Sequence, residues 1–228
     1  MKVLAIETAT IAGSVAICDD TAGLIGEVKI NVRIAHAERL MPSIIWLLES
    51  SRISIEEIDA FAISIGPGSF TGLRIGLSTV KGFAYATKKP VVAVPTLDAF
   101  ARTVPFSAYQ ICPLLDARKD EVFAGLYKWN EQNIIKIMPE RAVRPVDLLK
   151  EISEKTVFIG DGIIRYGDLM KEICGVRAIF PPLSIMSPSA ATVGEVAFEK
   201  IKQGDLADPV SLTPFYIRKS EAELNWKG

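Results

Sequence analysis

The chain has 228 residues, of which 49% are hydrophobic, and its formal net charge is −1 at pH 7. This near-neutral charge excludes a protein whose whole surface attracts nucleic acid through a basic field. No apolar run reaches the roughly 18 residues of a transmembrane helix, so the mean hydropathy of +0.28 predicts a large core or an apolar partner surface.

The N-terminal region is predicted to form three strands. Residues 2–7 are mostly apolar and predict a buried strand, which Glu7 distinguishes from a signal peptide. Two further apolar runs, 14–19 and 24–32, flank an Asp/Gly turn and predict a hairpin.

Residues 36–51 then change to helical spacing. The predicted core stripe consists of Ala37, Leu40, Ile44 and Leu48. Pro42 falls early in this helix, where a missing backbone donor costs least. A capping-box pattern at 54–57 predicts a short helix after it.

An alternating pattern of strands and helices completes the first half. The predicted elements are strand 60–65, helix 71–87, strand 91–94 and helix 96–103. A three-stranded meander extended by strand–helix units is the layout of the ribonuclease H-like fold, a sheet with helices on both faces.

The second half repeats this plan less regularly. Its first strand ends in Asp116, as the first strand of the chain ends in Glu7, and a polar turn and a second strand follow. Helices are predicted near 145–153, 163–173 and 188–203. This weak internal duplication predicts an α/β chain of two lobes, 1–107 and 108–228, with the actin-like (ribonuclease H-like) ATPase-superfamily fold. In that superfamily nucleotide lies between the halves.

The glycine-rich loop at 65–76 raises the question of phosphate binding. No Lys-Ser or Lys-Thr follows Gly72, so it is not a Walker loop, and its glycine spacing does not match the dinucleotide fingerprint. Amides at a helix start can hold an anion, but a turn with Ser69 or Thr71 as N-cap is the favoured interpretation. The candidate nucleotide contacts are Glu7, Thr8, Gly66, Gly68 and Asp116. The two acids either orient water or magnesium or simply end their strands.

The helix at 71–87 has a face with almost no side chains. Its small residues are Gly72, Gly76, Thr79, Gly82 and Ala86, and its only polar stripe is Arg74, Ser78, Lys81 and Tyr85. Each interior glycine costs about 1 kcal/mol relative to alanine. The stripe therefore predicts close approach of another element, either within the chain or in a partner.

Histidine and cysteine usage limits the catalytic classes. His36 is the only histidine, so HExxH and paired-histidine metal motifs are absent, and no GxSxG motif accompanies it. Cys18, Cys112 and Cys174 lie far apart, which predicts reduced core residues rather than disulfides or metal ligands.

At "IGPGSFTGLRIG" (65–76) the sequence resembles the signature of the TsaB (YeaZ) family of bacterial tRNA threonylcarbamoyladenosine biosynthesis proteins. The resemblance covers the whole chain. Matching segments are "LAIETAT", "HAERLMPSI", "LLDARKDEVFAGLY", "FIGDG" and "PFYIRKSEAELNW".

The resemblance implies a cytoplasmic subunit that binds no cofactor of its own. It implies a complex with the catalytic paralogue TsaD, the ATPase TsaE and the carbamoyl-adenylate-forming enzyme TsaC. That complex uses ATP and transfers a threonylcarbamoyl group to an adenosine beside the tRNA anticodon. This chain would pair with TsaD without catalysing the transfer, form homodimers when isolated and meet tRNA only through the complex.

Two positions depart from the related patterns. TsaD binds its metal through a His-x-x-x-His pair in a segment that matches "PTLDAF" here. The corresponding residues are Thr96 and Phe100, and neither suits a transition metal. Glu7 stands where the TsaB family more often has Asp.

The docking surface is predicted on helices 36–50 and 71–87. Its candidate residues are Leu40, Met41, Ile45, Trp46, Gly72, Leu73, Gly76, Leu77, Thr79, Val80, Gly82 and Phe83. Two other classes are weighed beside this one. An actin-like small-molecule kinase or ATPase would show ATP turnover by the isolated chain, and the lone histidine argues against a metalloprotease.

Overall fold

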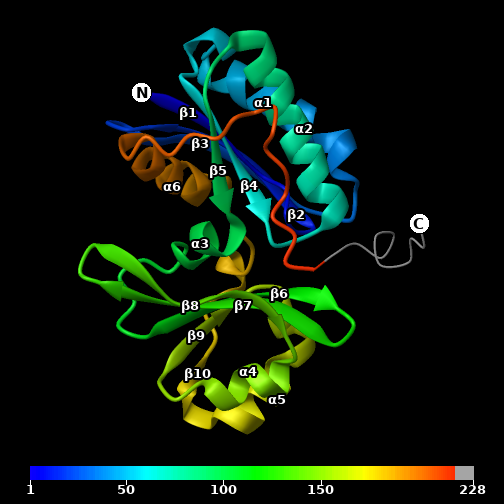
Figure 1. Cartoon of the computed structure of the whole chain (residues 1–228), viewed down its shortest axis with the longest axis vertical. Helices are drawn as coiled ribbons and strands as arrows, with labels where there is room; N and C mark the ends of the chain where they lie inside the picture. The colour runs from blue at the N-terminus through cyan, green and yellow to red at the C-terminus, as the bar shows by residue number, and fades with distance from the viewer. Residues whose placement is uncertain (219–228) are drawn as a thin grey trace. The chain divides into compact units, whose positions relative to one another are not determined.

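The computed structural model describes residues 1–218, which fold into two compact units, each built on a five-stranded sheet (Figure 1). The first unit comprises residues 1–103 and 188–214, and the second comprises 104–187 and 215–218 of the described residues. The first unit ends at residue 103, four residues before the expected boundary. It also includes residues 188–214, which the sequence analysis placed in the second lobe. Among the described residues, no helix is long and apolar enough to cross a membrane.

The sheet of the first unit has the order β3-β2-β1-β4-β5. Its strands are β1 (Lys2–Glu7), β2 (Ala12–Asp19), β3 (Gly23–Asn31), β4 (Ala60–Gly66) and β5 (Val91–Pro95). The first three strands form the predicted antiparallel meander, and β4 and β5 extend it in parallel.

Helices cover both faces of this sheet because its buried strands are apolar on both sides. Leu4 and Ile6 face α1 (His36–Ser51) and α2 (Phe70–Thr87), whereas Val3 and Ala5 face α3 (Thr96–Ala101) and α6 (Ala190–Lys202). Leu47 is buried with Leu40 and Ile44 on α1, and the predicted Leu48 is half-buried against the same core. The predicted stripe residue Ala37, in the first turn of the helix, is exposed instead. The short helix after α1 is a single 3-10 turn, Ile55–Glu57.

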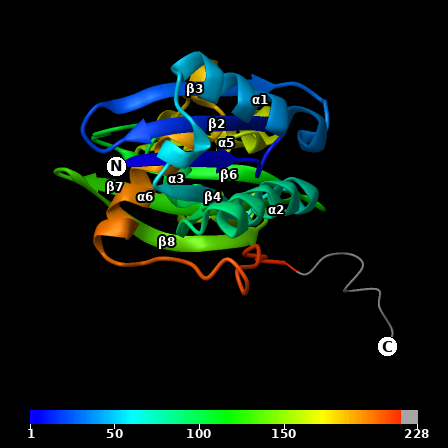
Figure 2. The ribbon, with the colours of Figure 1, turned by 90° about the horizontal axis from the view of Figure 1, so that it is seen from above.

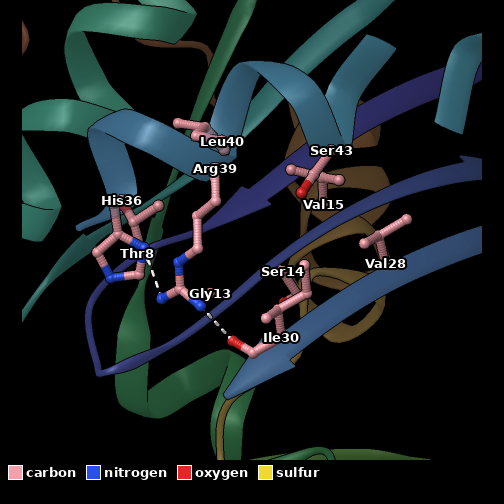
Figure 3. A pocket seen from close by; sticks show the side chains of 10 residues that line it. All are labelled: Thr8, Gly13, Ser14, Val15, Val28, Ile30, His36, Arg39, Leu40 and Ser43. Carbon is pink, nitrogen blue, oxygen red and sulfur yellow. Dashed lines mark hydrogen bonds between the residues drawn. The ribbon is translucent and has the colours of Figure 1, made fainter. Parts of the chain in front are cut away.

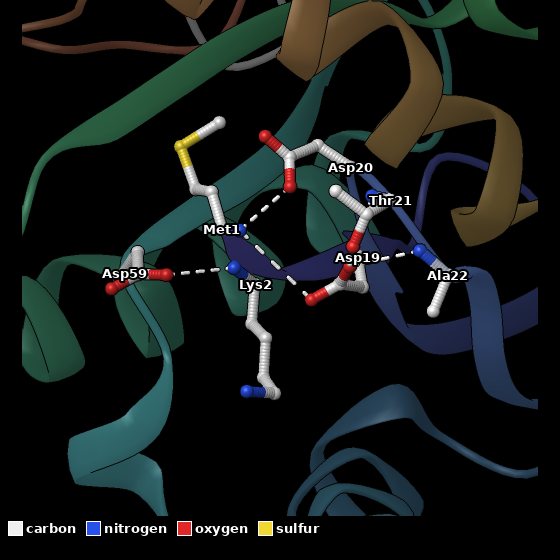
Figure 4. Close-up of polar contacts among 7 residues, drawn as sticks. All are labelled: Met1, Lys2, Asp19, Asp20, Thr21, Ala22 and Asp59. Carbon is white, nitrogen blue, oxygen red and sulfur yellow. Dashed lines mark hydrogen bonds and ion pairs between the residues drawn. The ribbon is translucent and has the colours of Figure 1, made fainter.

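Short polar contacts hold the start of β1 and the β2–β3 turn (Figure 4). The amino group of Met1 lies 2.6 Å from Asp20, and the Lys2 amide donates to Asp59 at 2.7 Å. Asp19 accepts the amide of Ala22 at 2.9 Å. The predicted Asp/Gly hairpin is therefore present, and its turn is stabilised by its own aspartate.

The second unit repeats the topology of the first. Its strands are β6 (Gln110–Arg118), β7 (Glu121–Asn130), β8 (Asn133–Val143), β9 (Thr156–Ile159) and β10 (Ala178–Ile179). The order β10-β9-β6-β7-β8, read from the opposite edge, is that of the first sheet. Its helices α4 (Pro145–Glu151) and α5 (Gly162–Cys174) pack on a core of their own, beside the 3-10 turns Gly175–Arg177 and Leu183–Ile185. This shared order confirms the internal duplication.

Helix α6 belongs to the first unit because it packs on the first sheet. Gly194 lies directly over Cys18, where a larger residue would clash with the thiol. At the start of the helix, the Ala190 amide donates to the Ser14 hydroxyl at 2.8 Å and to Glu27 at 3.0 Å. The predicted helix 188–203 is thus present, but its partners come from strands β2 and β3.

Candidate functional site

The glycine-rich loop after β4 turns the chain into α2. Gly66 has a φ of 125°, a conformation that favours glycine. Its amide donates to the Thr96 hydroxyl at 3.1 Å. The Ser69 hydroxyl accepts the Gly72 amide at 3.2 Å, so Ser69, and not the alternative Thr71, is the N-cap of α2.

The same loop presses α2 against the turn between β1 and β2. A Cβ on Gly68 would overlap the carbonyl group of Ala9, and one on Gly72 would overlap that of Thr8. The Ser69 amide donates to the Ala9 carbonyl at 2.6 Å. Carbonyl oxygens of the chain itself therefore lie against these glycines, where a phosphate would be repelled. This geometry supports the turn interpretation of the loop.

Glu7 is fully buried at the end of β1. Its carboxylate accepts the Ala9 amide at 2.5 Å and the hydroxyl of Ser64 on β4. Burial raises the pKa of Glu7 to about 7, against these two hydrogen bonds, which lower it. Glu7 thus joins the ends of two neighbouring strands, and both of its carboxylate oxygens are engaged within the chain.

The remaining nucleotide candidates are divided between the units. Thr8, Gly66 and Gly68 lie near Glu7 in the first unit, and the Thr8 hydroxyl is buried without a hydrogen-bond partner. Asp116 is in the second unit, where its carboxylate accepts the Arg118 amide at 2.9 Å. Over residues 1–218, no group of three or more His, Cys, Asp or Glu side chains is arranged to hold a metal ion.

The side chain of His36 contacts several segments of the first unit, a structural role that the sequence analysis did not predict. Its ring fits between Gly13 and Gly72, and a Cβ on Gly13 would lie 2.8 Å from it. Its Nε2 lies 2.7 Å from the Thr10 carbonyl. Its Nδ1 lies 3.1 Å from the Arg39 guanidinium (Figure 3). Gly13 and Gly72 leave room for the ring of His36, but the sequence could not indicate this because the three residues come together only in the folded chain.

Arg39 completes these contacts at the start of α1. Its guanidinium donates to the Ile30 carbonyl at 2.6 Å and to the carbonyl of Ile11. His36 and Arg39 line a cavity of about 10 Å³ between α1 and the β2–β3 hairpin (Figure 3). The start of α1 has no side-chain cap of its own, so these contacts to backbone carbonyls hold it.

The predicted docking residues separate into a buried group and an exposed group. Six are buried within the first unit: Leu40, Gly72, Leu73, Gly76, Leu77 and Val80. Phe83 stacks on the core residue Phe61 with ring centroids 5.4 Å apart, and the hydroxyl of the half-buried Thr79 donates to the Ile75 carbonyl. The six buried positions and Phe83 are corrected to internal packing, because Gly72 and Gly76 lie against Thr8 and the larger side chains fill the core of the first unit.

An apolar surface nevertheless remains on the two helices. On α1, Met41, Ile45 and Trp46 are 40%, 49% and 59% exposed, as predicted. On α2, Gly82 is exposed and a Cβ added there would have no neighbouring atom within 4 Å, and Tyr85 is 80% exposed. A groove of about 580 Å³ lies between the start of α1 and the first half of α2. It is lined by Ala37, Phe70, Thr71, Arg74, Ile75, Ser78 and Thr79.

Thr96 and Phe100, which the resemblance predicts to stand at the metal-ligand positions of TsaD, pack inside the first unit. Thr96 and Phe100 are both fully buried on α3. The Thr96 hydroxyl holds the glycine loop through the Gly66 amide, and Phe100 has no donor atom.

Comparison with known proteins gives matches over the whole chain. A family model described as TsaD, tRNA N6-adenosine threonylcarbamoyltransferase, matches residues 24–226. The Escherichia coli (strain K12) tRNA threonylcarbamoyladenosine biosynthesis protein TsaB is 30% identical, over 100% of this chain and 97% of that protein. The Bacillus subtilis (strain 168) TsaB is 27% identical, over 99% and 98%.

Solved structures agree with these matches. YeaZ from Pseudomonas aeruginosa superposes with a TM-score of 0.77 at 27% identity, covering 94% of this chain and 99% of that one. A Clostridium difficile activator of 2-hydroxyisocaproyl-CoA dehydratase, solved with bound ADPNP, has a TM-score of 0.51 at 10% identity, over 90% and 97%. The latter shares the fold alone, and it confirms the actin-like ATPase-superfamily fold. The chain belongs to the TsaB (YeaZ) family of tRNA threonylcarbamoyladenosine biosynthesis proteins.

Proposed function

We propose that this chain is the non-catalytic subunit that pairs with a TsaD-family transferase during tRNA threonylcarbamoyladenosine biosynthesis. Its relatives support participation in that pathway. The buried Thr96 and Phe100 support a non-catalytic role, because they replace a pair of metal ligands with a structural hydroxyl and a core ring. Catalysis then belongs to the partner, which this chain supports by binding.

The observation that carries the proposal is the apolar strip of Met41, Ile45 and Trp46 on α1. Residues 41 and 45 are four apart and lie on one helix face, and Trp46 is beside them. Tryptophan is enriched among the residues that dominate binding energy at protein interfaces. Together with the groove along α2, the strip forms a surface for a TsaD-family chain, and for a second copy of this chain when TsaD is absent.

The wider complex follows from the same assignment. TsaE and TsaC act with this pair, the complex uses ATP, and all of it works in the cytoplasm. The chain meets tRNA through the complex, because its net charge of −1 offers little of the phosphate neutralisation that drives tRNA binding.

The docking surface is tested with Trp46→Glu and Ile45→Glu. Val176, which is 88% exposed in the second unit, supplies the matched control Val176→Glu. Binding to the TsaD-family protein of the same genome is measured by calorimetry, and homodimerisation by light scattering. We expect at least a tenfold loss of TsaD affinity for the two α1 variants and no change for the control, with unchanged circular dichroism. Folded α1 variants that bind TsaD as the wild type does would show that the surface lies elsewhere.

The non-catalytic role has a separate test. The purified chain is expected to hold far less than one equivalent of iron or zinc by elemental analysis, and to turn over no ATP alone. Steady ATP hydrolysis by the isolated chain would favour the small-molecule kinase or ATPase alternative instead.

A further inference from the structure

The first turn of α1 is held only weakly by its own backbone. The residue before the helix, Ala35, provides no side-chain cap. Pro42 lies inside the helix and has no amide hydrogen, so the Glu38 carbonyl, four residues earlier, receives no hydrogen bond from it. This turn leads directly into the apolar strip of α1. Contacts with other segments therefore have to hold the part of α1 on which the docking surface begins.

Two side chains of the first turn supply such contacts. The Nε2 of His36 lies 2.7 Å from the Thr10 carbonyl, in the turn between β1 and β2. The Nδ1 of the same ring lies 3.1 Å from the Arg39 guanidinium (Figure 3). Arg39 in turn donates to the carbonyls of Ile30 and Ile11. The ring and the guanidinium thus form one connected set of hydrogen bonds between α1 and the first three strands.

The ring of His36 also lies between the two docking helices. Helix α1 packs on β2 and β3, helix α2 packs on β4, and the two helices lie side by side (Figure 2). A Cβ added to Gly72 of α2 would lie 3.3 Å from Cδ2 of the ring. The adjacent residues Ala37 and Thr71 both line the groove between the helices. Because each of them neighbours a residue of this contact, the position of the ring determines how far the groove opens.

Only a neutral ring makes both of its hydrogen bonds. The Thr10 carbonyl can only accept, so Nε2 donates and Nδ1 accepts from Arg39. A second proton on the ring would set two donors and two positive charges against each other at Nδ1. Burial lowers the pKa of His36, and Arg39, the charged group that acts on the ring, lowers it further. Gly13 and Gly72, which also face the ring, carry no charge that would compensate.

We propose that His36 is a positioning residue of the docking surface: its neutral ring holds the first turn of α1 and the groove in the form that binds a TsaD-family chain, and protonation of the ring releases them. The proposal rests on the function proposed above, because it concerns the same surface. It predicts that the order of α1 and the affinity for the TsaD-family subunit both follow the ionisation of this one side chain.

The order of α1 is measured without a partner. Backbone hydrogen exchange, corrected for the intrinsic effect of pH on exchange rates, is followed from pH 8 down to the pH at which nitrogen-15 NMR shows the ring protonated. We expect the protection of residues 36–40 to fall about tenfold as His36 titrates, while α6, on the other face of the sheet, changes less than about twofold. His36→Gln, which keeps an amide donor and does not titrate, should lack this pH dependence. Protection of 36–40 that persists with a protonated ring would overturn the proposal.

The affinity for the TsaD-family protein of the same genome is measured by calorimetry over the same pH range. Groups of the partner that titrate act equally on the wild type and on His36→Gln, so the ratio of the two affinities isolates the ring. We expect wild-type binding to weaken about fivefold relative to His36→Gln as the ring is protonated. Circular dichroism at each pH checks that both proteins remain folded. A ratio that stays constant would show that the ring does not govern docking, and would overturn the proposal.

Trp46→Glu separates this inference from the proposed function. Lost binding by Trp46→Glu, together with a constant ratio of the wild-type and His36→Gln affinities, overturns the role of His36 and leaves the docking helices in place. Normal binding by a folded Trp46→Glu variant overturns the docking surface itself, and the role of His36 with it.

Discussion

Gly76 of α2 lies directly against the side chain of Thr8, which belongs to the turn after β1. A Cβ at residue 76 would overlap the Thr8 hydroxyl and approach Ile63 Cδ1 to 2.8 Å. The small-residue stripe of α2 therefore serves two purposes along its length. Gly76 permits packing inside the first unit, whereas Gly82 faces open space.

The two glycines are predicted to respond in opposite directions to alanine. Gly76→Ala should destabilise the chain by about 1–3 kcal/mol, because a new methyl group must displace packed neighbours. Gly82→Ala should leave stability unchanged or raise it by up to about 1 kcal/mol, because alanine favours a helix and no neighbour is displaced. Urea unfolding of both variants measures this difference. Equal effects of the two substitutions on stability would contradict the assignment of Gly76 to internal packing and of Gly82 to the exposed surface.

Glu7 is predicted to make stability depend on pH. Its pKa is about 7 in the folded chain and near 4.5 when unfolded. Between these values the folded state keeps a proton that the unfolded state has released, so stability falls as pH rises from about 4.5 to 7 and is constant above that. Glu7→Gln should remove this decline, which is at most about 1.4 kcal/mol per pH unit.

Urea unfolding of the wild type and Glu7→Gln at several pH values between 4.5 and 8 checks the sign. The difference between the two proteins isolates Glu7 from the other titrating groups. If the free energies of unfolding of the wild type and Glu7→Gln change in parallel across this range, Glu7 is ionised in the folded chain.

His36 is predicted to be neutral with its proton on Nε2. The Thr10 carbonyl can only accept, so Nε2 donates to it, and Nδ1 then accepts from Arg39. Burial lowers the pKa of His36, and the charge of Arg39 also lowers it. Because the unfolded state binds the proton more readily, stability should decline as pH falls below the ordinary value near 6.5.

Nitrogen-15 NMR can observe this tautomer without assignment work, since His36 is the only histidine. We expect a protonated Nε2 and an unprotonated Nδ1 at pH 7, with titration only below pH 6.5. A ring protonated on both nitrogens at pH 7 would contradict the hydrogen-bond arrangement.

Glu27 is predicted to stabilise the start of α6. Its carboxylate accepts the Ser189 hydroxyl at 2.7 Å and the Ala190 amide at 3.0 Å, and a negative charge at a helix N-terminus is favourable. Glu27→Ala should cost about 1–2 kcal/mol of stability, in the range of a lost N-cap. Glu27→Gln, which retains an acceptor, should cost less. Equal unfolding midpoints for all three proteins would show that α6 does not depend on this contact.

Local patterns determined much of the fold from the sequence alone. The order of strands and helices in the first half, a helix cap at Ser69 or Thr71 and the strip of Met41, Ile45 and Trp46 outside the core stripe depend on spacing along the chain, and the structure confirms them. Strands β8, β9 and β10 of the second half were not predicted. The duplication was also visible, because strands that end in acids before polar turns recur in both halves. Periodicity along the chain places residues on a shared face of a helix or strand, so these features could be predicted without knowing what packs against them.

Only the tertiary structure decided what covers each face. A stripe of glycines allows close approach by any element, so the spacing could not reveal that Thr8 and Ala9 pack against Gly72 and Gly68. Nor could it place α6 on the first sheet, because the Glu27 contact joins residues more than 160 positions apart. The ring of His36 likewise gains its role from three segments that meet only after folding. Helical and strand periods are local, whereas the choice of a packing partner depends on which distant surface is complementary in shape and charge.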